Sequence, residues 1–131
     1  MSAQSDPFNL SDGWYCYRIN DGVDTKKPGI YEWRIDGAGS YIGQYRWISR
    51  PTTHYGRNLV KLFNGLPYRN RNPNGFRRIH KALADAHRDG RRIELIIVEN
   101  VELKIEHNRR EQALIKLRGN LNGRRSDQIS D

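Results

Sequence analysis

The chain has 131 residues, and 23 Lys and Arg against 15 Asp and Glu give it a formal net charge of +8. This length suits one compact domain. A mean hydropathy of −0.90 argues against a membrane-spanning helix. The first residues carry neither the basic nor the apolar region of a secretory signal. The single cysteine, Cys16, cannot form an internal disulfide, which suits a reducing cytoplasm.

The positive charge is concentrated between Arg46 and Arg92. This segment holds ten Arg and two Lys against two acidic residues, a net charge of +10. Arg outnumbers Lys 17 to 6 in the whole chain, and its planar head group binds phosphate through two parallel N–H donors. Such a surface favours a polyanionic partner, most often nucleic acid. The alternative is that the positive charge serves only to keep the protein soluble. Binding to a membrane surface is disfavoured, because no basic helix has the clean apolar stripe that it requires.

In chain order, the first elements are predicted to be strands. Residues 1–12 are small and polar and predict a disordered tail. The aromatic run Trp14–Ile19 is compatible with an extra strand. Ile30–Ile35 and Ser40–Tyr45 flank Asp36–Gly39, whose two glycines suit a hairpin turn. Charged residues alternate with apolar ones at the end of the first hairpin strand, which predicts a half-buried strand.

Two helices and a central strand are predicted next. Pro51 is expected to interrupt regular structure before a first helix, whose apolar residues repeat at helical spacing up to Phe63. The basic loop Pro67–Gly75 separates it from a second amphipathic helix that ends at Gly90. The uninterrupted apolar run within Arg92–Glu99 predicts a strand that is covered on both faces.

A third helix completes the expected domain. It begins at about Glu102 or Glu106 and runs to Leu117. The predicted fold is therefore α+β, with a small antiparallel or mixed sheet of three or more strands flanked by about three helices. Residues 13–123 are expected to form one domain and residues 124–131 a solvated tail.

Common catalytic and metal-binding patterns are missing from the sequence. There is no cysteine pair or close group of histidines and cysteines, which argues against a structural zinc site. There is no phosphate-binding GxxxxGK[ST] loop. For three of the four scattered histidines, His80, His87 and His107, we expect surface or packing roles.

Two triplets on the predicted hairpin strands point to a family. Gly29-Ile30-Tyr31 and Tyr41-Ile42-Gly43 are separated by nine residues. Either triplet alone is a weak signal, because aromatic and β-branched residues are common in strands. In this order, and with an Arg, a Glu and an Asn following in the expected elements, the pattern resembles the GIY-YIG nuclease family over about residues 28–123.

The resemblance implies a metal-dependent DNA endonuclease that hydrolyses phosphodiester bonds. Such a reaction needs an activated water and charge relief on the phosphate. Tyr31 would be the general base, Tyr41 would orient water or phosphate, and Glu111 would bind Mg²⁺ or Mn²⁺. One carboxylate completed by waters suits Mg²⁺, and the lack of an acidic cluster disfavours a two-metal mechanism. Arg57 would stabilise the phosphate, although Arg50 is the closer match by its distance from the second triplet.

Further residues complete the expected site. Asn122, with Asn120 as its rival, would fix the local backbone or the metal site, and His54 would assist the tyrosine base. Gly29 and Gly43 are expected to permit close approach of neighbouring strands or of phosphate. The residues expected to grip DNA are basic side chains of the charged segment: Arg46, Arg50, Lys61, Arg69, Arg71, Arg77 and Arg78.

The expected partner is DNA, with specificity supplied by loops, by a second copy of the chain in a homodimer, or by a separate specificity partner. The resemblance implies a cytoplasmic protein encoded by a bacterium or a phage, with no membrane partner. The main alternative is a noncatalytic, basic nucleic-acid-binding module with the same fold. A third reading is a basic interaction protein whose partner is an acidic protein, which salt-sensitive DNA binding would exclude.

Overall fold

The computed structural model describes residues 10, 13–102 and 104–122. The predicted tails at 1–12 and 124–131 lie outside these residues, except for Leu10. No helix in the described ranges is long and apolar enough to cross a membrane.

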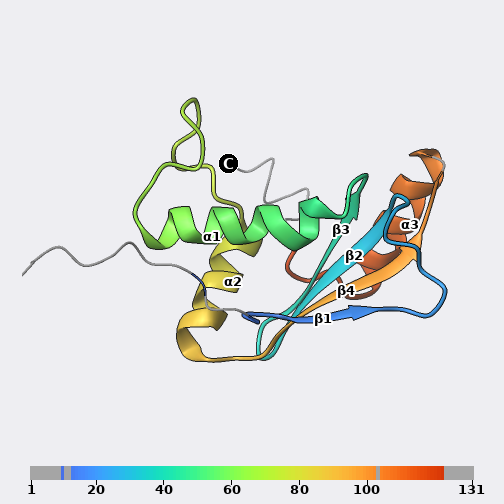
Figure 1. Cartoon of the computed structure of the whole chain (residues 1–131), viewed down its shortest axis with the longest axis horizontal. Helices are drawn as coiled ribbons and strands as arrows, with labels where there is room; N and C mark the ends of the chain where they lie inside the picture. The colour runs from blue at the N-terminus through green and yellow to red at the C-terminus, as the bar shows by residue number, and fades with distance from the viewer. Residues whose placement is uncertain (1–9, 11–12, 103, 123–131) are drawn as a thin grey trace, which may run out of the picture.

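Four strands form one mixed sheet in the order β1-β4-β2-β3 (Figure 1). They are β1 (Cys16–Ile19), β2 (Gly29–Ile35), β3 (Gly39–Tyr45) and β4 (Ile93–Asn100). β2 pairs antiparallel with β3 and β4, and β1 pairs parallel with β4. The predicted hairpin, the central position of β4 and the extra strand at the front are all confirmed, although β1 begins two residues later than Trp14.

Three helices cover the sheet, so the predicted α+β class is confirmed. α1 (Tyr55–Phe63) and α2 (Arg78–Asp89) lie on one face, and α3 (Lys104–Arg118) lies on the other (Figure 1). α2 ends as predicted at Gly90, which adopts the left-handed conformation at φ 68°.

The segment around Pro51 differs from the prediction. Residues Arg50–His54 form a single π-helical turn, η1, that runs directly into α1. Pro51 does not interrupt it, because proline at the first turn of a helix lacks an N–H that would have no helical partner there. The helical segment after β3 therefore begins at Arg50, seven residues before Arg57.

The alternation of side chains along β2 produces two apolar cores. Tyr31, Trp33 and Ile35 pack with α1 and α2 in the larger cluster. Ile30, on the opposite face, packs with Leu114 of α3 in the smaller one. Alternate positions along each strand thus face opposite sides of the sheet, which places the two tyrosines of the triplets on the face of α1 and α2.

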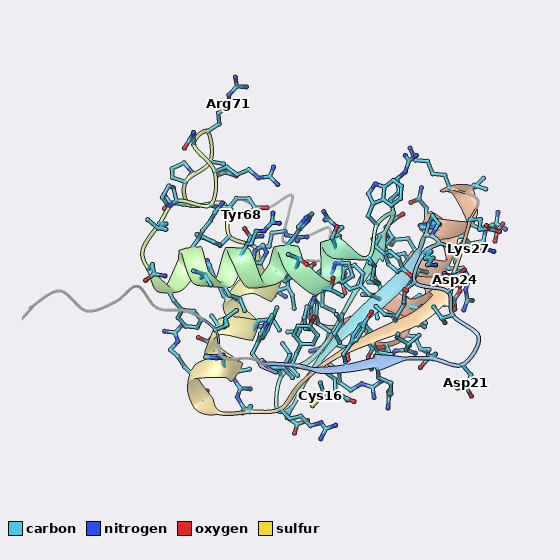
Figure 2. All side chains as sticks on the ribbon, in the orientation of Figure 1. Cys16, Asp21, Asp24, Lys27, Tyr68 and Arg71 are labelled. Carbon is cyan, nitrogen blue, oxygen red and sulfur yellow. The ribbon has the colours of Figure 1, made fainter. Side chains whose placement is uncertain are left out.

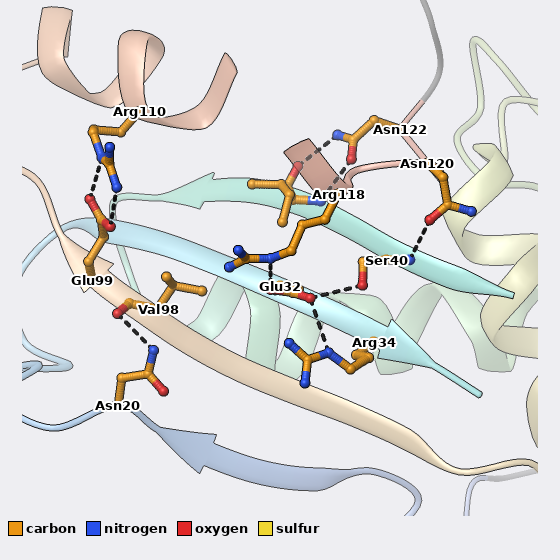
Figure 3. Close-up of polar contacts among 11 residues, drawn as sticks. Asn20, Glu32, Arg34, Ser40, Val98, Glu99, Arg110, Arg118, Asn120 and Asn122 are labelled. Atoms are coloured by element: carbon orange, nitrogen blue, oxygen red, sulfur yellow. Dashed lines mark hydrogen bonds and ion pairs between the residues drawn. The ribbon is translucent and has the colours of Figure 1, made fainter. Parts of the chain in front are cut away.

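Glu32 does not occupy the exposed position that its alternation in β2 predicts. Its carboxylate is fully buried under α3 and accepts hydrogen bonds from Ser40 Oγ at 2.8 Å, Arg118 Nε at 2.8 Å and Arg34 Nε at 3.2 Å (Figure 3). A buried carboxylate is tolerated when several donors compensate for its lost hydration. This group joins β2, β3 and the last turn of α3.

Candidate active site

A basic cleft opens beside η1, α1 and the loop that precedes α2. It has a volume of about 410 Å³. Its lining contains five Arg or Lys side chains and no carboxylate, which makes it attractive to an anion. The lining residues are Arg50, His54, Tyr55, Arg57, Asn58, Lys61, Tyr68, Arg69 and Arg77.

Three tyrosine hydroxyls meet at the inner wall of this cleft. Tyr31 Oη of β2 lies 2.6 Å from Tyr55 Oη of α1. Arg77 donates from Nη1 to Tyr41 Oη at 2.9 Å and from Nη2 to Tyr55 Oη at 3.3 Å. One guanidinium group therefore joins a tyrosine of the second triplet to the pair that contains the tyrosine of the first.

Burial holds the hydroxyls of Tyr31 and Tyr55 in their neutral form. Burial raises the pKa of Tyr31, and Tyr41 raises it further, whereas the Tyr55 hydrogen bond and the charges of Arg50 and Arg77 lower it in part. Burial likewise raises the pKa of Tyr55. The Tyr31 side chain is only 1% exposed and does not line the cleft, whereas Tyr55 is one of the lining residues.

The glycines of both triplets are required by close packing. A Cβ at Gly43 would overlap the Tyr31 ring, with Cε1 at 2.7 Å, and one at Gly29 would overlap the Glu99 carbonyl oxygen. The two triplets are thus coupled directly, because the tyrosine of the first lies over the glycine of the second. This supports the structural role that the sequence predicts for both glycines.

Replacing Gly43 with alanine is expected to lower the free energy of unfolding by about 1–3 kcal/mol, the usual cost of overpacking. Gly56 in α1 is the matched control, because a Cβ there meets its nearest atom, Leu10 Cδ1, at an ordinary 3.5 Å. Gly56→Ala should instead stabilise the fold by about 0.5–1 kcal/mol. Urea denaturation of both variants measures the contrast, and equal effects would contradict the packing argument.

Both candidate arginines line the cleft, but the charge of Arg50 acts on more of the predicted site residues than that of Arg57. The Arg50 charge lowers the pKa of Tyr31 and, on the other side, that of Glu111. Burial lowers the pKa of His54, and the charges of Arg57 and Arg50 lower it further. Arg50 thus lies within electrostatic reach of both the tyrosine group and the predicted metal ligand, and it begins the helical segment.

Glu111 of α3 offers a half-buried carboxylate. Its Oε1 accepts a hydrogen bond from Gln44 Nε2 at 2.9 Å, and Gln44 Oε1 lies 3.0 Å from His107 Nδ1. Burial raises the pKa of Glu111, and the Gln44 hydrogen bond, His107 and Arg50 partly offset this. Within the described ranges Glu111 has no ion pair, and no group of three or more His, Cys, Asp or Glu side chains gathers. A single carboxylate of this kind fits Mg²⁺, which retains most of its waters.

The side-chain amides of Asn120 and Asn122 form hydrogen bonds with backbone groups at or next to the free edge of β3. Asn122 accepts from the Ile42 N–H and donates to the Ile42 carbonyl, both at 2.8 Å (Figure 3). Asn120 accepts from the Ser40 N–H and donates to the Ala38 carbonyl, also at 2.8 Å. Both amides are engaged with backbone, so of the two roles expected for Asn122 the geometry supports fixing the local backbone.

The predicted DNA-binding residues divide into two groups. Arg50, Lys61, Arg69 and Arg77 line the cleft, although the guanidinium of Arg77 is committed to the tyrosines. The remaining three, Arg46, Arg71 and Arg78, are exposed outside the lining. Figure 2 shows Arg71 at the tip of the loop between α1 and α2, with Tyr68 nearer α1.

Sequence patterns did not assign the observed roles of several residues of the site. Tyr55, Asn58 and the tyrosine-binding role of Arg77 follow from tertiary packing alone. His80, for which a packing role is expected, is indeed fully buried, and its Nδ1 accepts the backbone N–H of Arg77 at 3.0 Å. Protonating Nδ1 would place two N–H donors against each other and break this hydrogen bond. Burial, together with the charges of Arg77 and Arg50, lowers the pKa of His80 to about 4.

This burial predicts acid sensitivity. Between about pH 6.5 and pH 4 the unfolded chain binds a proton at His80 that the folded chain does not, so the free energy of unfolding should fall as pH is lowered through this window. The full difference corresponds to roughly 3–4 kcal/mol. Urea denaturation across this range should show a flatter slope for His80→Gln, with His87→Gln on the same helix as the control. An unchanged slope in His80→Gln would contradict the assignment.

Comparisons of the chain with protein-family models, with curated proteins and with solved structures found no match.

Proposed function

We propose that the protein is a divalent-metal-dependent endonuclease that hydrolyses phosphodiester bonds in DNA, by the chemistry of the GIY-YIG family that its triplets resemble. The observation that carries the proposal is the position of Arg50. Its charge acts on the tyrosine group on one side and on the Glu111 carboxylate on the other. The basic cleft that Arg50 lines contains no carboxylate and offers a place for the phosphate beside the tyrosine group, whereas Glu111 lies outside its lining.

Arg50 is assigned the role of holding the scissile phosphate. Negative charge increases on the phosphate oxygens as the reaction proceeds, and a preorganised guanidinium stabilises that charge more in the transition state than in the bound substrate. Arg57, Lys61 and Arg69 line the same cleft and bind the flanking phosphates. In this proposal Arg57 loses the catalytic role that its place in the sequence suggested.

The tyrosine group is assigned to activating the water. As a phenolate, Tyr31 or Tyr41 would accept a proton from the attacking water and become neutral. The guanidinium of Arg77, which already donates to Tyr41 and Tyr55, would stabilise the phenolate that forms by ionisation before this transfer. Burial opposes this ionisation at Tyr31. Mg²⁺ or Mn²⁺ on Glu111 would supply positive charge to the phosphate and to a bound water.

A noncatalytic nucleic-acid-binding module is the second candidate. The burial of Tyr31 favours it, because a hydroxyl that is 1% exposed and has a raised pKa is a poor base. In such a module the same basic cleft would bind DNA without cutting it.

The test is nicking of supercoiled plasmid with Mg²⁺, with Mn²⁺ and with EDTA. The endonuclease proposal requires cleavage with a divalent cation and none with EDTA. Salt-sensitive DNA binding without cleavage under any of these conditions would support the binding module instead. Absence of both would favour an acidic protein as the partner.

A further inference from the structure

One tryptophan lies on the surface beside the cleft. Trp14 and Trp33 stack on each other at a centroid distance of 5.5 Å, and Trp33 is fully buried. Trp47, in contrast, is 67% exposed. Tryptophan is highly buried on average, so Trp47 is exposed to an unusual degree for its residue type.

Trp47 is fixed close to Arg50. The Arg50 N–H donates to the Trp47 carbonyl at 3.0 Å, a turn that brings the two Cα atoms within about 7 Å of each other. The Arg46 guanidinium lies 5.8 Å from the indole centroid. An exposed aromatic ring with one guanidinium group beside it therefore lies where β3 leads into η1, one turn before Arg50.

A second aromatic and arginine pair lies at the other end of the cleft. The Arg69 guanidinium lies 4.9 Å from the Tyr68 ring centroid, and both residues line the cleft. Lys61 Nζ donates to the Tyr68 carbonyl at 3.2 Å, which ties this pair to α1. From Arg50 to Lys61 the helical segment rises about 16 Å, the length of about five stacked nucleotides.

We propose that the cleft binds a DNA strand with unpaired bases, one of which stacks on the exposed Trp47 while the phosphates face the basic side chains as far as Arg69. The Tyr68 ring is partly covered by Phe76 and His80. Aromatic platforms alternating with a basic groove are the usual means of holding single strands. In a duplex the base faces are covered by neighbouring pairs and are closed to such platforms. This inference rests on the proposed function for its partner, DNA, and specifies the substrate class as single-stranded or locally unpaired DNA.

The test is fluorescence anisotropy in EDTA with a labelled single-stranded oligonucleotide and with a blunt duplex of the same sequence. The single strand is expected to bind more tightly. Trp47→Ala should weaken single-strand binding by about 5- to 100-fold, the range that loss of one base stack gives, and change duplex binding by less than about twofold. Trp47→Phe should retain most of the affinity. Leu117→Ala, which removes a side chain of α3 that is 74% exposed, is the control.

Several results would overturn the inference. One is that Trp47→Ala binds the single strand as tightly as the wild type does, and another is that the wild type binds the duplex more tightly than the single strand. A third is that the wild type sediments as a dimer and Trp47→Ala as a monomer, because the indole would then pack against a second copy of the chain. Because binding is measured in EDTA, the two proposals fail separately. Trp47-dependent single-strand binding without metal-dependent cleavage of either the plasmid or the single strand contradicts only the proposed function. Metal-dependent cleavage together with single-strand binding that does not depend on Trp47 contradicts only this inference.

Discussion

Replacing Glu111 with alanine is expected to lower the rate of DNA cleavage by about 10²–10³-fold, the usual cost of losing one preorganised charge interaction at a reacting phosphate. DNA affinity should stay within about a factor of three, because phosphate binding depends on the cationic side chains of the cleft. Single-turnover cleavage in Mg²⁺, with affinity measured separately in EDTA, distinguishes the two effects.

Glu106→Gln is the matched control for this prediction. Glu106 lies on the same helix and forms a 3.3 Å ion pair with the exposed Arg109, so its loss should leave cleavage unchanged. Glu111→Gln, which keeps the side-chain length, should be as inactive as the alanine variant. Cleavage by Glu111→Ala at the wild-type rate would show that this carboxylate holds no essential cation.

The second large effect is expected at Arg50. Arg50→Ala should also reduce single-turnover cleavage by about 10²–10³-fold, whereas Arg57→Ala should cost less than about tenfold. Each variant removes one cation from the cleft lining, so each should reduce the slope of log affinity against log salt by about 1. If both variants lose a similar amount of DNA affinity but Arg50→Ala loses far more cleavage rate than Arg57→Ala, Arg50 is the residue that stabilises charge in the transition state.

Arg50→Lys tests the geometry of that interaction. It retains the positive charge but loses the two parallel donors of the guanidinium, so partial recovery of the rate is expected. If Arg57→Ala instead shows the larger loss of cleavage rate, Arg57 is the residue that stabilises the phosphate. The effect of the Arg50 charge on Glu111 then plays no part in catalysis.

Much of the fold could be predicted from local sequence patterns. The hairpin followed from two apolar segments around Asp36–Gly39, and α2 from its apolar spacing and the stop at Gly90. The roles of Gly29 and Gly43 were also foreseeable, since glycine within a strand marks a close approach. Each of these features depends on residues near one another in the sequence.

The features that sequence patterns missed depend on long-range contacts. Glu32 occupies a position that alternation assigns to solvent, and its burial depends on Arg118, 86 residues further on. The expected break at Pro51 was wrong, because Arg50–His54 form a helical turn that runs into α1, and the choice between Arg50 and Arg57 stays a prediction. Tyr55 joins the site through a hydrogen bond across 24 residues, for which the chain has no local pattern.

The bonds that Asn120 and Asn122 make to β3 have a consequence for self-association. Together with the Leu121 N–H, which donates to the Ser40 carbonyl, they satisfy the outward-facing N–H and C=O groups of Ser40 and Ile42. A strand of another chain cannot pair at these positions, which protects this border of the sheet from edge-to-edge aggregation. In the described part of the chain, β1 forms the opposite border. Any continuous sheet between two copies would therefore extend from β1, on the side of the sheet away from β3, and η1 would remain accessible to DNA.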